Sequence, residues 1–266
     1  MKYALISGSE SGLALAVLDN LKKLDYTIFC CDLKYCENKV IDNIHYLKLD
    51  ATNNDNINEV YDYISNITNK LDLISNFAGI VTLGSLVELD MDSLSKILNI
   101  NLISTYKLNA KFFPLLKEAR GRIINISSEY AKICAIPFHG YYGISKHAFE
   151  VYNDSLRREL LGSGVKVVCM RPGAFKTNMQ EGVMAQFGRM VDETNLYKTP
   201  LMKMKHIMSG ELVKAKDPYI FAKAYMKALL AKNPRRYYNV KNSFKMKLLS
   251  ILPIWLQDFA FKIYLK

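Results

Sequence analysis

The sequence predicts an α/β fold in which a doubly wound parallel sheet carries helices on both faces within a single domain. Short apolar runs that look like buried strands alternate with segments whose apolar residues recur at helical spacing. The first such run passes through a glycine-containing turn directly into a helical pattern. The length of 266 residues is ordinary for one unit of this class, and the 50% of hydrophobic residues is ample for a core.

The first strand is expected from Lys2 to Ser7, followed at once by the turn from Gly8 to Ala14. Glycines in such a turn let the backbone approach a pyrophosphate, and the free N–H groups of the helix start bind the anion. An ordinary strand-to-helix turn is the alternative interpretation. The helix after the turn is indicated by apolar residues at Leu13, Ala16, Val17, Leu21 and Leu24.

A second strand is expected from Tyr26 to Cys31, and it ends in Asp32. A carboxylate about twenty residues beyond the glycine turn can accept hydrogen bonds from an adenosine ribose, and it repels a 2′-phosphate. The turn contains no Arg or Lys that would bind such a phosphate, although Lys34 is close in sequence. The sequence therefore predicts NAD rather than NADP, while Asp32 as a plain turn residue is compatible with the pattern.

Tyr142 and Lys146 stand four residues apart, a spacing that places both side chains on one face of a helix. A fixed ammonium beside a phenol stabilises the phenolate and lowers its pKa from about 10, so Tyr142 becomes a usable general acid or base. Tyr141 has no Lys at this spacing. A Ser hydroxyl alongside would hold a carbonyl toward the phenol, which suits proton transfer at a C–O oxygen. By itself the pair is a common pattern on solvated helices.

The order of the motifs resembles the short-chain dehydrogenase/reductase family from residue 2 to about residue 240. The segment from Ser7 to Ala14 resembles T-G-x-x-x-G-x-G, with Ser for Thr and Ala for the last Gly. Asp50-Ala51 resembles the acidic pair that contacts adenine, and it follows a strand-like run from Ile44 to Leu49. Asn76-Phe77-Ala78-Gly79, after Leu71 to Ser75, resembles N-N-A-G with Phe in place of the second Asn.

The second half of the chain carries further motifs of this family. Asn101 begins a match to N-x-x-G, and Ser128 closes a match to the strand-end motif whose second Ser is catalytic. The segment from Arg171 to Thr177 resembles the P-G-x-x-x-T segment that lines the nicotinamide. The region from Asp217 to Val240 looks most like hydroxysteroid and retinol dehydrogenases of the family.

The resemblance implies a Rossmann-type fold and a catalytic tetrad of Asn101, Ser128, Tyr142 and Lys146. In the reductive direction Tyr142 would protonate the carbonyl oxygen and Ser128 would hydrogen-bond it. Lys146 would lower the pKa of Tyr142 and hold the nicotinamide ribose, and Asn101 would anchor a water that relays protons. Cofactor contacts are expected from Gly8, Ser11, Gly12, Leu13, Asp32, Asp50, Ala51, Asn76, Ala78, Gly79, Tyr142, Lys146, Gly173, Phe175 and Thr177.

The predicted function is hydride transfer between NAD(P) and an alcohol or ketone. A cofactor-binding regulator without turnover is one alternative, but such a protein would normally have lost Tyr142 or Lys146. Epimerase or dehydratase chemistry on a nucleotide sugar is another, although those relatives usually have longer substrate domains. The substrate region is expected at about residues 178–216. Its methionines favour a bulky lipophilic substrate such as a steroid or retinoid, although they are also ordinary core residues: Met179, Met184, Met190, Met202, Met204 and Met208.

Charge and cysteine content limit the partners and the setting. Five cysteines show no C-x-x-C or ligand spacing, so no metal site is expected and a reducing cytoplasm suits the chain. The N-terminal apolar run leads straight into the glycine turn and is not expected to be a signal peptide. Residues 198–247 hold 13 Lys and Arg against Glu211 and Asp217, so they carry the +11 excess of the whole chain. Nucleic acid is disfavoured because this basic stretch lacks a recognised binding module.

The chain divides into residues 1–243, the dinucleotide-binding domain, and a basic, apolar tail at residues 244–266. Pro253 and Asp258 interrupt the tail, and no uncharged run approaches the ~20 residues that a bilayer span requires. Trp255 and Phe259 could lie at a membrane interface while lysines meet anionic headgroups, so a peripheral membrane location is possible. Alternatively the tail covers the substrate pocket or packs against a second subunit. By resemblance, residues 91–119 and 142–161 are expected to pair across a two-fold axis in a homodimer or homotetramer.

Overall fold

The computed structural model describes residues 1–88 and 92–265. Within these residues an eight-stranded sheet runs in the order β3-β4-β2-β1-β5-β6-β7-β8, and all neighbouring strands are parallel except β3 and β4. The doubly wound α/β fold predicted from the sequence is confirmed. The strands are β1 (Lys2–Ser7), β2 (Tyr26–Asp32), β3 (Lys39–Ile41), β4 (Ile44–Lys48), β5 (Leu73–Asn76), β6 (Arg122–Ile126), β7 (Lys166–Pro172) and β8 (Tyr237–Val240).

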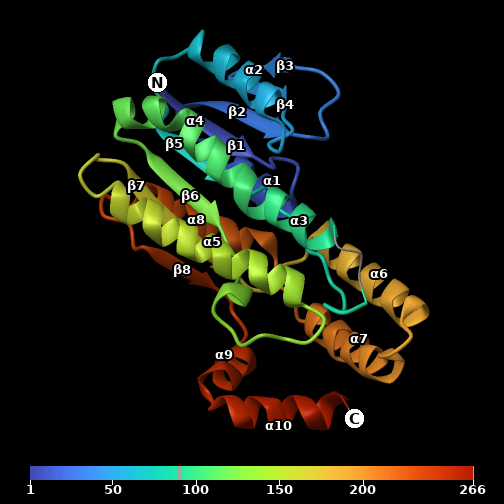
Figure 1. Cartoon of the computed structure of the whole chain (residues 1–266). Helices are drawn as coiled ribbons and strands as arrows, with labels where there is room; N and C mark the ends of the chain where they lie inside the picture. The colour runs from blue at the N-terminus through green and yellow to red at the C-terminus, as the bar shows by residue number, and fades with distance from the viewer. Residues whose placement is uncertain (89–91, 266) are drawn as a thin grey trace.

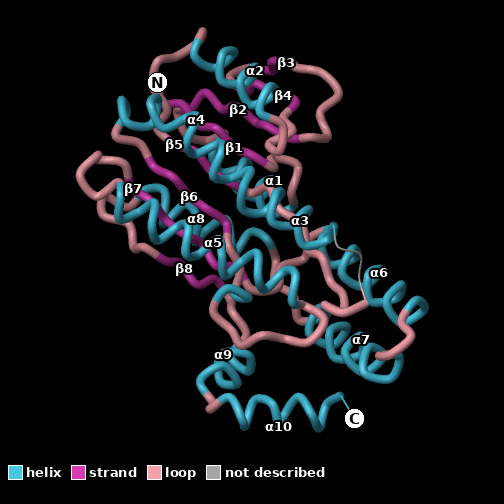
Figure 2. Tube along the Cα trace, viewed as in Figure 1, coloured by secondary structure: helices cyan, strands magenta, loops and turns pink. Residues whose placement is uncertain are grey.

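Helices cover both faces of the sheet (Figures 1 and 2). One face packs against α1 (Gly12–Leu21) and α8 (Pro218–Leu230), and the other packs against α2 (Asn54–Ser65), α4 (Ser104–Ala119) and α5 (Gly140–Glu159). The remaining helical elements are α3 (Asp92–Leu98), η1 (Asn99–Ile103), η2 (Glu129–Ala131), α6 (Asn178–Glu193), α7 (Lys198–Val213), α9 (Phe244–Ile251) and α10 (Ile254–Leu265). Among the described residues, none of these helices combines the length and the hydropathy needed to cross a membrane.

The apolar run of β1 is continuous because both of its faces are buried. Ala4 and Ile6 pack into the core beneath α1 and α8, whereas Leu5 points into the core beneath α2 and α4. This alternation follows from the two-residue period of a strand, and a strand covered on both sides needs apolar residues at every position. The same reasoning explains the largely apolar sequence of β2, in which Ile28 and Cys30 pack on one side and Phe29 and Cys31 on the other.

The strand order reverses next to β1, which lies between β2 and β5. At the carboxyl end of β1, Ser7 is in register with Cys31 on one side and Asn76 on the other. The connections leave this point toward opposite faces of the sheet, so a crevice forms beyond the strand ends. Ligands of doubly wound sheets bind at this position, and the glycine turn that follows Ser7 lies there.

The structure differs from the sequence-based expectations in three elements. The short antiparallel strand β3 was not anticipated, because its three exposed residues, Lys39–Ile41, carry no burial signal. The stretch 91–119, expected to pair across a two-fold axis, is divided into α3, the π-helix η1 and α4, and Met91 lies outside the described residues. The residues from Asn178 to Lys216, expected as a substrate loop, form α6 and α7.

A buried ion pair ties α5 to the sheet edge formed by β7 and β8. Arg171 Nε donates to Glu150 Oε1 at 2.8 Å and Arg171 Nη2 donates to Oε2 at 2.6 Å. The guanidinium also lies 3.6 Å from the centre of the Tyr237 ring. Bidentate geometry and the stacked ring compensate for the removal of both charges from water.

Arg171→Leu should lower the free energy of unfolding by about 3–5 kcal/mol, because it leaves the Glu150 carboxylate buried without its cation. Arg158→Leu is the matched control, since Arg158 is an exposed partner of Asp154 at 3.9 Å and surface pairs contribute at most about 1 kcal/mol. Urea unfolding of the two variants measures the difference. Equal losses in both would contradict the role assigned to the buried pair.

Candidate active site

The glycine turn approaches the end of β5 closely at one position. Gly8 has a φ of +68°, and its N–H donates to the Cys31 carbonyl at 2.8 Å. A Cβ atom on Gly8 would lie 2.4 Å from the Ala78 backbone nitrogen. Both the left-handed backbone and the lack of space require glycine. The turn is therefore a backbone-lined cradle, and Ala78, expected as a cofactor contact, lies beside it.

Helix α1 begins at the bottom of this cradle. Ser11 caps the helix through its side chain, which accepts the Ala14 N–H at 3.3 Å. A Cβ on Gly12 would lie 2.8 Å from Thr177 Cγ2, so Thr177 at the start of α6 closes the other side. First-turn N–H groups of a helix have no intrahelical acceptor and attract phosphate. These residues fit the pyrophosphate of a dinucleotide, and Leu13 packs beneath them on the core.

Asp32 is held against the glycine turn by two backbone contacts. Its Oδ2 accepts the Glu10 N–H at 2.9 Å and its Oδ1 accepts the Lys34 N–H at 3.0 Å. The side chain of Glu10 is held separately, because its Oε1 accepts the Tyr35 hydroxyl at 3.0 Å. Asp32 was predicted from the sequence, whereas Glu10 was not. The contacts of Glu10 with Asp32 and Tyr35 depend on the fold of the turn.

Four further expected cofactor contacts have structural roles of their own. The Asp50 carboxylate accepts the Thr52 N–H at 2.9 Å and hydroxyl at 2.7 Å, which shapes the turn that includes Ala51. Gly173 approaches β8 so closely that a Cβ would lie 2.3 Å from the Lys241 carbonyl. The Phe175 side chain is buried in the core against Phe221, so only its backbone is available to a ligand.

A network of buried amides joins the strand ends to the helices behind them. Asn76 accepts the Ser7 hydroxyl at 3.3 Å, and its Nδ2 donates to Asn109 at 2.9 Å and Asn125 at 2.8 Å. Asn125 donates in turn to Asn153 at 3.0 Å. Asn76, expected as a cofactor contact, is thus a central member of this network.

Asn101 lies in the π-helix η1, between α3 and α4. Its Oδ1 accepts the Ile80 N–H at 2.8 Å, and its Nδ2 donates to the Ile80 carbonyl and to Ser145 Oγ, both at 3.0 Å. Gly79 stands beside it, because a Cβ there would meet Asn101 Oδ1 at 3.3 Å and Lys146 Nζ at 3.8 Å. π-turns inside helices occur frequently at functional sites. The structure therefore brings Asn101, Gly79 and Lys146 together.

Tyr142 and Lys146 occupy one face of α5, as their spacing predicts, and both are buried. The Tyr142 hydroxyl hydrogen-bonds the Ser128 side chain. Lys146 Nζ lies 5.8 Å from the centre of the Tyr142 ring and donates to the Ile126 carbonyl at 3.3 Å. The four predicted tetrad residues therefore meet at the carboxyl end of β6.

The electrostatics of this site differ from the sequence-based expectation. Lys146 was expected to lower the pKa of Tyr142, but burial raises the pKa of this phenol to about 12, and the nearby Glu129 carboxylate adds to the rise. Burial also lowers the pKa of Lys146 to about 8. For both residues the largest cause is desolvation, which disfavours the charged form. Tyr142 is therefore protonated at neutral pH, the state in which it can donate to a carbonyl oxygen.

Two residues beside the tetrad escaped the sequence analysis. Glu129 follows Ser128 and is buried, which raises its pKa, and its Oε2 accepts the Ser243 N–H at 2.6 Å. His139 stacks on Tyr130 with ring centres 5.3 Å apart, and burial lowers its pKa to about 4. Neither residue stands in a recognisable motif, although Glu129 is the sequence neighbour of Ser128 and His139 precedes Tyr142 by three positions.

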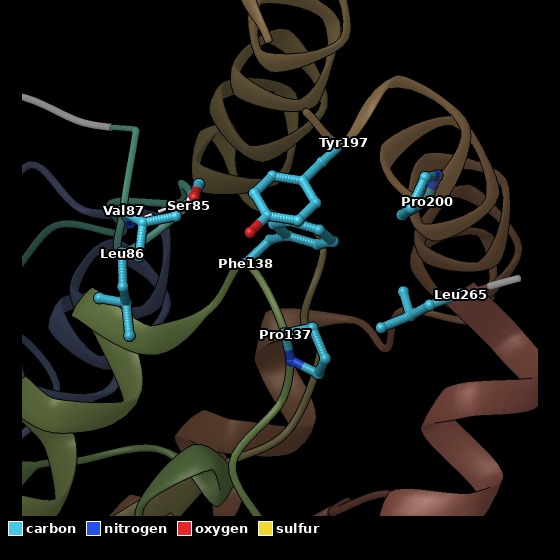
Figure 3. A pocket seen from close by; sticks show the side chains of 8 residues that line it. All are labelled: Ser85, Leu86, Val87, Pro137, Phe138, Tyr197, Pro200 and Leu265. Carbon is cyan, nitrogen blue, oxygen red and sulfur yellow. Dashed lines mark hydrogen bonds between the residues drawn. The ribbon is translucent and has the colours of Figure 1, made fainter. Parts of the chain in front are cut away.

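An apolar cavity of about 330 Å³ opens beside the start of α5 (Figure 3). Its wall touches this helix, because the Tyr141 hydroxyl donates to the Ser85 carbonyl at 3.4 Å. The end of α10 closes one side through Leu265. The lining residues are Ser85, Leu86, Val87, Pro137, Phe138, Tyr197, Pro200 and Leu265.

The chain matches the family model described as short chain dehydrogenase over residues 2–187. The chain belongs to the short-chain dehydrogenase/reductase family. The resemblance seen in the sequence motifs is thus confirmed. As a member of this family the protein is an oxidoreductase that acts on CH–OH groups with a nicotinamide cofactor, and the cradle between β1 and α1 suits that cofactor.

Curated relatives in this family include dehydrogenases and reductases. Short-chain dehydrogenase/reductase family 9C member 7 of Mus musculus is 28% identical, with 99% of this chain and 90% of the relative covered. The NADPH-dependent 3-dehydrocapnine reductase of Ornithobacterium rhinotracheale is 29% identical over 90% and 88%. The 17-beta-hydroxysteroid dehydrogenase type 6 of Rattus norvegicus is 31% identical, over 68% of this chain and 59% of the relative.

Solved structures of short-chain dehydrogenases share the fold. A member from Saccharomyces cerevisiae has a TM-score of 0.76 at 21% identity, covering 91% of this chain and 97% of that chain. One from Burkholderia phymatum, in complex with NAD, has a TM-score of 0.73 at 18% identity over 90% and 88%. One from Burkholderia cenocepacia, in complex with NADP, has a TM-score of 0.70 at 20% identity over 90% of each chain.

Proposed function

We propose that this enzyme transfers hydride between NAD(H) and a bulky lipophilic alcohol or ketone, with Ser128, Tyr142 and Lys146 as its reacting-site residues. The observation that carries the proposal is the buried Tyr142 phenol, hydrogen-bonded to Ser128 and accompanied by Lys146 on the same helix face. A bound nicotinamide supplies or accepts the hydride.

The protein residues hold the substrate oxygen and move its proton. In the reductive direction Ser128 hydrogen-bonds the carbonyl oxygen, and Tyr142, protonated because burial raises its pKa to about 12, donates its proton as the oxygen gains charge. Lys146 has a pKa of about 8, so it exchanges protons near neutral pH and can restore the phenol. Asn101 acts as a positioning residue that holds Ile80 and Ser145 around Lys146.

Two observations support a lipophilic substrate. The cavity beside α5 is lined almost entirely by apolar side chains, as expected for a site that takes up a hydrophobic ligand. Relatives of this chain are named retinol dehydrogenase 7 and 17-beta-hydroxysteroid dehydrogenase type 6. The methionines are weaker support than the sequence suggested, since Met190, Met204 and Met208 pack between α6 and α7.

NADH consumption with a panel of steroid, retinoid and medium-chain ketones tests the proposal. Tyr142→Phe should lower turnover roughly 10²-fold or more, because it removes the transferable proton, and should leave NADH binding intact. Tyr141→Phe is the matched control and should have a far smaller effect. Reversed effects of the two substitutions would overturn the assignment. Consumption limited to small polar ketones would overturn the lipophilic substrate class.

We infer that NAD is preferred over NADP. The Asp32 carboxylate lies against the glycine turn through the Glu10 N–H, and Glu10 of the same turn carries a second negative charge. Neutral ribose hydroxyls can donate to Asp32, whereas a phosphate would be repelled. The relative from Ornithobacterium rhinotracheale is named NADPH-dependent, so membership of the family does not itself select the cofactor, and the inference rests on the charge of Asp32.

Asp32→Ala should raise the ratio of kcat/KM for NADPH over NADH by roughly tenfold, the effect of removing about 1.4 kcal/mol of like-charge repulsion. Asp25→Ala is the matched control, because Asp25 precedes the opposite end of the same strand. Steady-state kinetics with both cofactors gives the ratio. A wild-type enzyme that turns over faster with NADPH at equal concentration would refute the preference.

We also propose that the enzyme is a symmetric oligomer that pairs through α4 and α5. Large apolar side chains are exposed on the outer surface of this pair, including Tyr106 and Val151. In a two-fold interface the same exposed face of each subunit packs against its copy.

Light scattering should give a multiple of the 30.4 kDa chain mass, and Val151→Arg should give the monomer mass. Leu230→Arg, on the exposed end of α8, should leave the assembly unchanged; a monomeric wild type at micromolar concentration would contradict the proposal.

A further inference from the structure

Helices α9 and α10 extend from the body of the molecule at the C-terminal end of the chain (Figure 1), and several of their large apolar side chains are exposed. Trp255, Phe259 and Ile263 are 68%, 60% and 60% exposed and recur every four residues, so they form one stripe along α10. Further large apolar side chains are exposed on the two helices: Phe244, Leu248, Ile251 and Ile254. Several exposed large apolar side chains on one short segment point to an interaction site.

Hydrogen bonds and one apolar contact attach α9 and α10 to the region around Ser128 and the apolar cavity. The Ser243 N–H, at the start of α9, donates to Glu129 Oε2 at 2.6 Å, and Glu129 is the neighbour of Ser128. The Cys134 N–H donates to Ser250 Oγ on α9 at 2.7 Å. Leu265 at the end of α10 lines the apolar cavity (Figure 3). The outward face is therefore held in one orientation, next to the cavity mouth.

The charges around this face fit an anionic surface. Lys245, Lys247 and Lys262 are exposed on the two helices, against the single acidic residue Asp258. Lys245 and Lys247 belong to the stretch 198–247, which carries the basic excess of the chain. A second copy of the same face would bring these lysines against one another, whereas a phospholipid headgroup layer would neutralise them and accept the tryptophan and phenylalanine rings.

We propose that the outer face of α9 and α10 docks reversibly on an anionic phospholipid membrane, beside the mouth of the apolar cavity. Apolar side chains enter the boundary between headgroups and acyl chains while the lysines contact anionic headgroups. The helices lie along the surface. A lipid-dissolved molecule would then reach the cavity at Leu265 with a short path through water.

The single tryptophan of the chain makes the docking directly observable, because Trp255 lies on the proposed contact face. Full-length protein is titrated with vesicles of phosphatidylcholine containing phosphatidylserine, and with vesicles of phosphatidylcholine alone. The expected result is a shift of Trp emission to shorter wavelength and co-sedimentation with the phosphatidylserine vesicles, both weakened by salt. Neither readout depends on turnover, so failure of the proposed function and failure of this proposal are distinguishable.

Two variants separate the apolar and the charged contributions. The double variant Phe259→Ser, Ile263→Ser should abolish the emission shift, and the double variant Lys245→Glu, Lys247→Glu should weaken vesicle binding roughly 30-fold or more, because each basic residue near the surface contributes about a fivefold factor. Leu230→Ser, an exposed apolar position on α8, is the matched control and should bind like the wild type. Unchanged thermal unfolding and NADH binding establish that each variant is folded.

Three outcomes would overturn the proposal. The first is an unchanged Trp emission with phosphatidylserine vesicles. The second is equal binding to neutral vesicles at all salt concentrations. The third is an emission shift that appears on raising the protein concentration without lipid, which would assign the face to a second copy of the chain.

Discussion

Buried side-chain amides hold together the elements on which the site depends. Asn76 at the end of β5 bonds to Ser7 of β1, Asn109 of α4 and Asn125 of β6, and Asn125 bonds to Asn153 of α5. In a low-dielectric interior each of these hydrogen bonds is strong, and any unpaired member would be costly. The glycine turn, the Ser128 segment and the Tyr142 helix all start from elements in this network, so their separation is fixed by one set of contacts.

The parts of the site that could be predicted from the sequence depend on local geometry. The glycine turn after a buried strand, the acidic end of β2 and the four-residue spacing of Tyr142 and Lys146 each follow from backbone periodicity, and the structure places these residues accordingly. The pKa of Tyr142 could not be predicted in this way. Its direction depends on burial and on Glu129, neither of which is visible in spacing.

Contacts between residues far apart in the sequence account for the other differences between the expected and the observed site. Phe175 belongs to a motif expected to line the cofactor, but its ring fills the core against Phe221, contributed by α8. Glu129 has no motif of its own, and its contact with Ser243 joins residues more than a hundred positions apart. In the tail, Leu265 lines the cavity while Trp255 and Phe259 of the same helix are exposed, so contact with the cavity and an outward apolar surface are compatible in α10.

The π-helix η1 joins α3 and α4, which pack against two different hydrophobic clusters. Before it, Ile97 of α3 packs in a small cluster with Tyr141 and Tyr142; after it, Leu108 and Phe112 of α4 pack in the large core beneath the sheet. An i→i+5 turn shifts the phase of a helix, so that its apolar side changes direction partway along. Asn101 stands at this change of phase. A shift of α4 on the sheet would therefore also displace α3, whose Ile97 packs in the same cluster as Tyr142. In this way the packing around the Tyr142 phenol depends on how α4 packs on the sheet.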